Sequence, residues 1–267
     1  MFYRKRTYFI ALLLLYIATP VCADNTVDVS ARVLNFGYEE FDQSGESYNQ
    51  ENGIIPGLSL STSLTHNKLS SVFSFEVYDG QVDYDGQTQS GTPHTTNTDE
   101  TQYRLFYMLG WSAENISSMF YGKFVWQQWD RDILPTGNVS GLFERYRWWT
   151  FEAGILTTLY QSEMDQLQFE LGASKVTNGS IKIDLDAFGY GQPSLDLGDG
   201  SGLTSALKYR HQIHNGDDIG LSLEYRYWTF GRSNSKTISN NVNTITITEP
   251  RSESRQIILS VSYSHYF

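Results

Sequence analysis

A short acidic pair, Asp83 and Asp85 with Tyr84 between them, is the part of this sequence that most clearly suggests chemistry. Two carboxylates that lie close together can share a proton and activate a water molecule. His94 follows nine residues after Asp85, and two glycines between them leave the backbone free to fold back. Asp83, Asp85 and His94 therefore form a candidate hydrolytic site. The simpler interpretation is a solvated acidic loop.

A second acidic group, further along the chain, gathers possible ligands for a hard cation. Ions such as Ca²⁺ bind carboxylate and carbonyl oxygens. No EF-hand spacing occurs, so four residues are metal candidates by composition alone: Asp184, Asp186, Asp196 and Asp199. The five His residues show no clustered spacing for zinc, and no G-x-S-x-G elbow is present. The sequence predicts no cofactor.

Alternation of apolar and polar residues predicts the strands that must position these groups. Residues 257–267 are the clearest case, because every second side chain from Ile257 to Phe267 is apolar or aromatic apart from His265. A closed barrel would pair this last strand with the first and leave no bare edge. Similar alternation predicts nine further strands, around residues 27–33, 58–64, 73–77, 103–109, 120–126, 149–155, 167–173, 203–209 and 221–227.

The connections between the predicted strands alternate between short turns and long loops, which is typical of outer-membrane barrels with their short turns in the periplasm. All six Trp residues lie near predicted strand ends, where an interfacial aromatic belt is expected. We therefore predict that residues 24–267 form an all-β, closed antiparallel transmembrane barrel of about ten strands. The long connections are expected at residues 39–54, 80–98, 130–142, 175–202 and 231–254.

Residues 177–185 leave the strand count open. The Thr-Asn-Gly sequence at 177–179 is a hairpin turn signal, and Ile181, Ile183 and Leu185 alternate after it. Counting this segment as a membrane strand would place the carboxyl end on the wrong side of the membrane. We expect a hairpin that rises above the membrane, with a barrel of twelve strands as the alternative.

The polar faces of the predicted strands carry charges of both signs. An Arg or Lys on the lipid face near the membrane midplane would cost about 2–4 kcal/mol, so we expect these side chains to point into the lumen. A ten-stranded barrel is little wider than the eight-stranded kind that side chains nearly fill. The network is therefore interpreted as a plug or constriction, with a purely stabilising role as the alternative. Its predicted members are Arg32, Glu76, Arg104, Lys123, Glu152, Glu170, Lys208, Arg210, Glu224 and Arg226.

The first 23 residues have the pattern of a secretory signal peptide. Basic residues at 4–6 precede an apolar run at 9–21 that is too short to span a bilayer comfortably, and a cleavage-like ending at Ala23 follows. The single Cys of the chain, Cys22, lies in this segment. A lipoprotein is the alternative, although the residue before Cys22 is larger than such sites require. The mature chain would then form no disulfide.

The composition agrees with a barrel and excludes one class of partner. The 267 residues include 18 Tyr and 15 Phe, which favour half-buried pleated surfaces. The mean hydropathy of −0.38 is compatible with strands that alternate apolar and polar residues. The formal net charge of −11 becomes still more negative when the basic leader is removed. Nucleic-acid binding is therefore not expected, because it needs a basic face.

The carboxyl-terminal residues Tyr263, His265 and Phe267 resemble the terminal signature of bacterial outer-membrane barrel proteins, in which a final aromatic residue follows alternating apolar positions. This resemblance implies the outer membrane of a Gram-negative bacterium as the location. It also implies the barrel assembly machinery, membrane lipid and lipopolysaccharide as partners. The ligand, a small solute or a surface partner, stays open.

The acidic pair also resembles part of the omptin site. Omptins are ten-stranded outer-membrane endopeptidases with an Asp-x-Asp pair at this strand-to-loop step and an Asp-His couple in the fourth loop. Here residues 175–202 contain no His, and Asp83 and Asp85 share the lipid-facing register of residues 73–77 unless Gly80 marks a bulge. We therefore expect a non-enzymatic, porin-like barrel, narrow or plugged, with acidic external loops that contact a solute, a cation or a partner. An omptin-like surface endopeptidase and a secreted soluble β protein are the alternatives.

Overall fold

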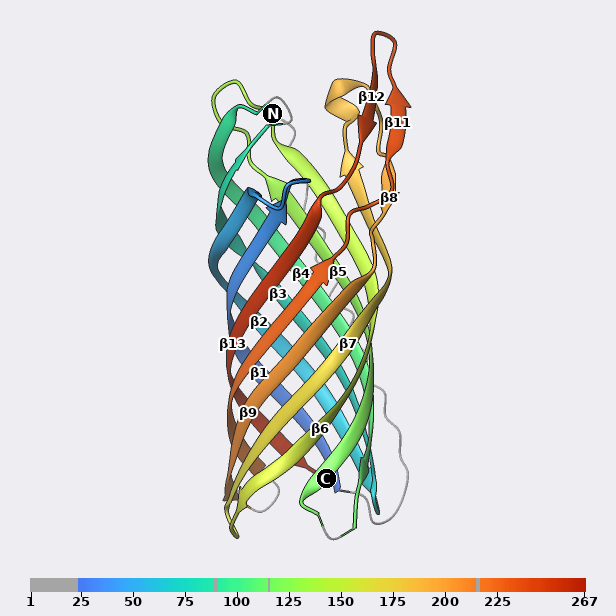
Figure 1. Ribbon diagram of the computed structural model, residues 1–267. Helices are drawn as coiled ribbons and strands as arrows, with labels where there is room; N and C mark the ends of the chain where they lie inside the picture. Colours follow the sequence, from blue (N-terminus) through green and yellow to red (C-terminus); the bar gives the residue numbers. More distant parts are fainter. Residues whose placement is uncertain (1–23, 89–90, 115, 215–216) are drawn as a thin grey trace.

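The chain forms ten long strands that close into one barrel (Figure 1). The computed structural model describes residues 24–88, 91–114, 116–214 and 217–267, so the predicted signal peptide lies outside the described residues. The predicted ten-stranded antiparallel barrel is confirmed, and the twelve-stranded alternative is not. The barrel strands are β1 (Asp24–Phe41), β2 (Ser47–His66), β3 (Leu69–Gln87), β4 (Pro93–Ser112), β5 (Ser118–Ile133), β6 (Leu142–Gln161), β7 (Asp165–Asp184), β9 (Gly200–His214), β10 (Asp217–Phe230) and β13 (Arg251–Tyr266).

Every barrel strand is paired antiparallel with a neighbour on each side. Val29 of β1, for example, faces Leu60 of β2 and Tyr263 of β13. The pairing of β6 with β7 joins the two ends of the sheet and closes the wall. The terminal strand β13 therefore has no bare edge, and the backbone N–H of Phe267 donates to the Asn25 carbonyl at 3.0 Å.

Alternation along the strands gives the barrel an apolar outer belt. In β13 the outward Leu259 is 49% exposed, whereas its inward neighbour Ile258 is completely buried. A strand of about 20 residues is about 66 Å long at roughly 3.3 Å per residue. Tilted by about 45°, it rises about 47 Å, against an apolar band of about 25 Å. On β3 the outward side chains change from Phe73 and Phe75 to Asp79, Asp83 and Asp85. One end of the barrel therefore projects well beyond the belt.

Two of the predicted long connections are mostly strand. Residues 39–54 and 80–98 continue β1–β2 and β3–β4, because β1 and β3 reach Phe41 and Gln87 before the chain turns. Beyond the apolar belt the outward positions are polar, so the hydrophobic alternation fades although the hydrogen-bonded ladder continues.

The structure also corrects the interpretation of residues 177–179. They lie inside β7, where Asn178 has a positive φ of 51°. Thr177 pairs with Trp149 and Ser180 with Arg147, so the register shifts by one residue at this point. Asn178 therefore forms a β-bulge instead of a hairpin turn. The following residue pair, Ile181 and Ile183, continues β7 with both side chains buried.

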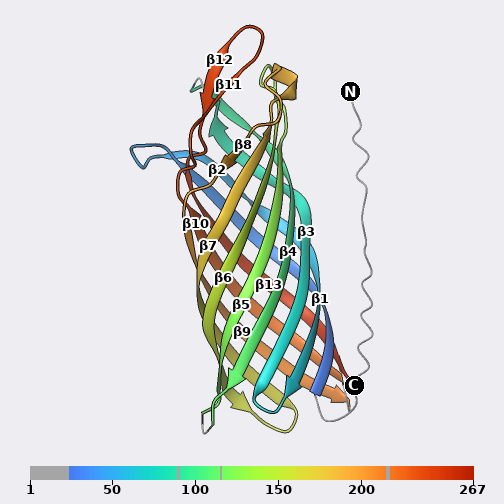
Figure 2. The same ribbon diagram turned by 90° about the vertical axis from the view of Figure 1, so that its right-hand side faces the viewer.

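Small elements stand at the outer end, opposite the carboxyl terminus (Figure 2). They are a 3-10 turn η1 (Asp186–Phe188), β8 (Ser194–Asp196), which pairs with β7, and a hairpin of β11 (Lys236–Ser239) and β12 (Thr244–Ile247). The amide of Asn240 at the hairpin tip donates to the Phe188 carbonyl at 2.9 Å. No helix in the described part of the chain is long and apolar enough to cross a membrane.

The buried hydrophobic side chains lie in the lumen and include three of the six Trp residues. Trp129, Trp148 and Trp228 are at most 8% exposed. Trp129 stacks on Tyr146 with ring centroids 4.7 Å apart, and Phe36 meets it edge-on at 5.7 Å. The prediction that all six Trp residues belong to an interfacial belt is therefore wrong for these three, which fill the barrel.

Candidate functional site

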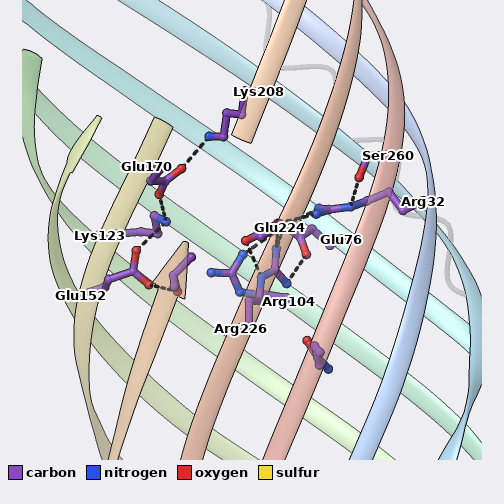
Figure 3. Close-up of polar contacts among 12 residues, drawn as sticks. Arg32, Glu76, Arg104, Lys123, Glu152, Glu170, Lys208, Glu224, Arg226 and Ser260 are labelled. Atoms are coloured by element: carbon purple, nitrogen blue, oxygen red, sulfur yellow. Dashed lines mark hydrogen bonds and ion pairs between the residues drawn. The ribbon is translucent and has the colours of Figure 1, made fainter. Parts of the chain in front are cut away.

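An ion network centred on Glu76 of β3 crosses the lumen (Figure 3). Arg226 of β10 donates to both carboxylate oxygens of Glu76, at 2.8 and 2.9 Å, and this bidentate pair fixes the orientation of both groups. Arg32 of β1 and Arg104 of β4 contact Glu76 Oε1 at 2.7 and 3.0 Å. Glu224 of β10 bridges Arg32 at 2.7 Å and Arg226 at 2.6 Å. Three guanidinium groups can lie this close because two carboxylates lie between them.

A second network lies beside the first and joins β5, β6, β7 and β9. Lys123 Nζ of β5 lies 2.7 Å from Glu152 Oε1 of β6 and 3.0 Å from Glu170 Oε1 of β7. Lys208 Nζ of β9 reaches Glu170 Oε2 at 2.6 Å. The Tyr121 hydroxyl donates to Glu152 at 2.9 Å. The structure thus brings nine of the ten predicted lumen charges together in two clusters, one linking β1, β3, β4 and β10 and the other linking β5, β6, β7 and β9 (Figure 3).

Arg210 lies apart from these clusters, near the carboxyl-terminal end of the barrel. It lines an open cavity of about 360 Å³ together with Asp218 and Tyr266. The Tyr266 hydroxyl donates to Asp218 Oδ2 at 2.6 Å. This cavity at the rim is open to solvent. Beyond the ion networks, a void of only about 10 Å³ borders Arg104 and Trp148, which is about the space that one water needs.

The outer half of the barrel encloses a group of acidic residues that we call the carboxyl chamber. It is formed by five carboxyl groups, all at most 5% exposed, around the guanidinium of Arg131 of β5. Arg131 Nε donates to Glu51 Oε1 at 2.9 Å, and its Nη1 lies 3.0 Å from Glu40 Oε1 and 2.7 Å from Glu144 Oε2. The carboxyl groups are those of Glu40, Glu51, Glu100, Glu144 and Glu249.

Neutral groups donate hydrogen bonds to some of the carboxyl oxygens of the chamber. Thr98 donates to Glu51 Oε1 at 2.7 Å, the Asn49 amide donates to Glu40 Oε2 at 2.7 Å, and the Trp129 indole N–H donates to Glu100. Other buried polar atoms of the chamber have no hydrogen-bond partner among the described residues: Glu51 Oε2, Glu100 Oε1, Arg131 Nη2 and His94 Nε2.

Glu249 reaches the chamber from a segment outside the barrel wall, between β12 and β13. The Tyr146 hydroxyl donates to its Oε1 at 2.6 Å. Burial, followed by the nearby carboxyl groups of Glu40 and Glu144, holds the pKa of Glu249 well above its ordinary value. The arrangement therefore favours a proton on this carboxyl group.

The candidate hydrolytic residues lie on opposite faces of the wall. Asp83 and Asp85 point outward and are exposed, and β3 shows no register shift at Gly80 that would turn them inward. His94 of β4 is buried in the lumen, with its ring centroid 5.7 Å from that of Tyr84. The structure thus does not bring His94 and the two aspartates to one site.

The metal candidates are also distributed over separate contacts. The amide of Gln192 donates to Asp184 at 3.3 Å and to Asp186 at 2.8 Å. The backbone of Asp196 bonds to Asn234, and Asp199 pairs with Lys175 at 3.0 Å. Among the described residues, no group of three or more His, Cys, Asp or Glu side chains could hold a metal ion.

The residues of the predicted assembly signal face outward at the opposite end of the barrel. Tyr263 is 47% exposed, and the His265 ring stacks on Phe267 with centroids 6.5 Å apart. His265 Nδ1 lies 2.8 Å from Asp217 Oδ1 of the neighbouring strand. These side chains are therefore available to lipid or to another protein at the rim.

Neither a protein-family model nor a curated protein matches the sequence. Among solved structures, the outer membrane protease OmpT from Escherichia coli is similar with a TM-score of 0.57 and 10% identity, over 91% of this chain and 97% of that one. The chain has the fold of an outer-membrane β-barrel. The translocator domain of the autotransporter NalP from Neisseria meningitidis gives a TM-score of 0.47 at 10% identity, over 90% and 88% of the two chains. OprG from Pseudomonas aeruginosa gives 0.40 at 10%, over 91% and 96%. At these identities the likeness concerns the fold alone.

The sequence pattern did not predict the carboxyl chamber. Glu40 and Glu51 fell in the predicted loop at 39–54 and Arg131 in the loop at 130–142, whereas Glu100 lay between the predicted loop at 80–98 and the predicted strand at 103–109. One signal was available. Arg131 lies an even number of residues from Lys123 on β5, and Glu100 lies an even number of residues from Arg104 on β4, so each pair points to the same face of its strand. Extending the predicted strands 103–109 and 120–126 by three and five residues, with the same alternation of inward and outward side chains, would have placed Glu100 and Arg131 in the lumen.

Proposed function

We propose that this protein is a closed, non-enzymatic barrel in the outer membrane of a Gram-negative bacterium, which presents its outer end to the medium, a small solute or a surface partner. The filling of the lumen is the observation that carries this proposal. Two ion networks, a layer of aromatic side chains and the carboxyl chamber follow one another from the middle of the barrel to its outer end. Trp129, Arg131 and Tyr146 are each at most 1% exposed.

The outer surface supports the proposed location. A belt of half-exposed apolar side chains such as Leu221, Leu223 and Leu259 would be unfavourable in water, and it matches the hydrocarbon layer. Membrane lipid and lipopolysaccharide are therefore the proposed neighbours of the wall, with the barrel assembly machinery as the partner during insertion. A secreted soluble protein would have to cover this belt. Stable monodispersity without detergent would favour that alternative.

A proteoliposome assay tests whether the barrel is closed. Vesicles with the refolded mature chain are diluted into solutions of sugars of increasing size, and swelling is followed by light scattering. We expect the rate to equal that of protein-free vesicles for every sugar. Swelling that is faster with the protein and declines with sugar size would show an open pore and overturn the proposal.

An endopeptidase of the omptin type is the second candidate, which the likeness in fold to a protease favours. The outward position of Asp83 and Asp85 argues against it, because the pair and His94 cannot act on one water molecule. We expect no cleavage of a panel of basic peptides, with or without lipopolysaccharide. Cleavage by the wild type that is lost in Asp83→Ala, Asp85→Ala and His94→Ala would establish the enzyme.

A further inference from the structure

The carboxyl chamber holds more acidic groups than its cation can neutralise. Arg131 is the one Lys or Arg that the described chain places among five buried carboxyl groups. An ionised carboxylate that is buried without a partner is strongly unfavourable, and such a group takes up a proton instead. Several of the five groups must therefore be neutral when the chamber is closed.

One contact in the chamber requires a proton on a carboxyl group. The Tyr146 hydroxyl lies 2.6 Å from Glu249 Oε1 and 3.3 Å from Glu144 Oε2. It has one hydrogen to donate, so the second contact is favourable only if a carboxyl group supplies a proton.

Glu249 connects the chamber to the external hairpin β11–β12. Its backbone N–H donates to Ser233 Oγ at 2.7 Å, and its carbonyl accepts from the Ser233 N–H at 3.1 Å. These bonds tie together the two ends of the hairpin. Ile247, two residues before Glu249, is 4% exposed and packs in the buried hydrophobic cluster with Ile181 and Leu195. Docking of the hairpin and burial of the Glu249 carboxyl group therefore occur together.

We infer that the carboxyl chamber is a proton-binding site, and that a proton on Glu249 holds the β11–β12 hairpin against the outer mouth of the barrel. Loss of this proton places a negative charge beside the carboxyl groups of Glu40 and Glu144, and the hairpin then leaves the mouth. The titratable and charged groups that act on Glu249 are Tyr38 and Glu40 (β1), Arg131 (β5), and Glu144 and Tyr146 (β6). The other titratable groups buried in this part of the lumen are Glu51 (β2), Tyr84 (β3), and His94 and Glu100 (β4).

The direction of the pH effect follows from the raised pKa of docked Glu249. A carboxyl group whose pKa is higher in the docked state binds its proton more tightly there, so low pH favours docking. The stabilisation of the docked state by this proton is complete below the ordinary Glu pKa of about 4.3 and is lost as the pH rises through the raised pKa of docked Glu249. One proton changes the ratio of undocked to docked molecules by at most about tenfold per pH unit.

Thiol labelling at two hairpin positions tests this inference. The mature chain is expected to contain no Cys, so Ile247→Cys reports on a buried position and Val242→Cys, 82% exposed, on a free one. The maleimide labelling rate at position 247 is divided by the rate at position 242 at each pH from 5 to 9. This ratio cancels the intrinsic pH dependence of the thiol. We expect this ratio to rise by up to about tenfold per pH unit, and to stay low in the Glu249→Gln background. Glu46→Gln, an exposed loop substitution, should leave the rise unchanged.

A ratio that is constant with pH, or that rises equally in Glu249→Gln, would overturn the inference. Because Ile247→Cys can itself loosen the hairpin, hydrogen exchange of the Ser233 and Glu249 amides is measured on the unsubstituted protein. After correction for intrinsic rates, protection of these amides should fall with rising pH and persist in Glu249→Gln. Protection that does not change with pH would also refute it. Neither outcome depends on whether the barrel conducts.

Discussion

Replacing Arg131 with Met tests how much the single guanidinium of the carboxyl chamber contributes to stability. Arg131 makes three charged contacts of 2.7 to 3.0 Å, and all three partners are nearly inaccessible. Removing one side of a buried ion pair typically costs about 3–5 kcal/mol, because the remaining charge stays buried without a partner. We expect the free energy of unfolding at neutral pH to fall by about this amount. The loss should be smaller near pH 4.5, where protons can neutralise the carboxyl groups.

Arg145→Met is the matched control, since Arg145 lies on the adjacent strand at the outer end. It makes two bonds of 2.7 Å to Asp130, but its side chain is 35% exposed and faces outward. Exposed pairs are worth about 0–1 kcal/mol, so this variant should remain close to wild type. Unfolding by guanidinium in detergent, followed by Trp fluorescence and by heat-dependent gel mobility, gives both values. Equal losses in the two variants would refute the assignment of Arg131 to a buried, charge-poor chamber.

Three further predictions concern the inner network, barrel closure and processing. Arg104→Ala removes a buried partner of Glu76, so the free energy of unfolding should fall by about 3–5 kcal/mol, or less if water enters, and the denaturant midpoint should fall with it. The exposed Arg255→Ala should leave the midpoint unchanged, and equal midpoints for Arg104→Ala and wild type would contradict this prediction. Deletion of Phe267, whose N–H bonds to β1, should reduce the amount of folded, heat-modifiable protein in the membrane, and unchanged assembly would count against its role. Amino-terminal sequencing of the membrane-extracted protein should begin at Asp24, and an acylated Cys22 at the start would disprove it.

The wall of the barrel could be predicted because each membrane strand carries the signal by itself. Alternation in residues 257–267 or 73–77 reflects the contrast between lipid and lumen, and it needs no knowledge of the neighbouring strands. The parity of the inner charges follows from the same alternation, so Glu76 and Arg104 could be assigned to one face before their pairing was known.

The outer third of the barrel could not be predicted in the same way. Around Glu51 and Glu100 the outward neighbours are polar, so the contrast that marks a strand disappears. Hydrogen bonding between strands maintains the ladder there, and a single sequence does not show that bonding. The chamber also depends on Glu249, whose position is set by the packing of Ile247 against residues of β7 and β8.

Two predictions, the hairpin turn at 177–179 and the interfacial position of Trp129, were wrong for physical reasons. The Thr-Asn-Gly signal at 177–179 reflects a residue with positive φ, and a bulge at Asn178 uses that conformation as well as a hairpin does. Trp129 lies near a strand end, which suggested a belt, but it has the inward parity of Lys123 on the same strand. The alternation of side chains along a strand therefore predicted whether a Trp faces the lumen or the lipid better than its distance from the strand end did.

Single-channel recording on the refolded mature chain in a planar bilayer shows directly whether the lumen is filled and closed. We expect the protein to insert, as verified by heat-dependent mobility of the same preparation, and to show no steady conductance steps at neutral pH. Uniform and stable steps from the folded protein would mean that the ion networks and the carboxyl chamber leave a continuous water path, and would contradict this expectation.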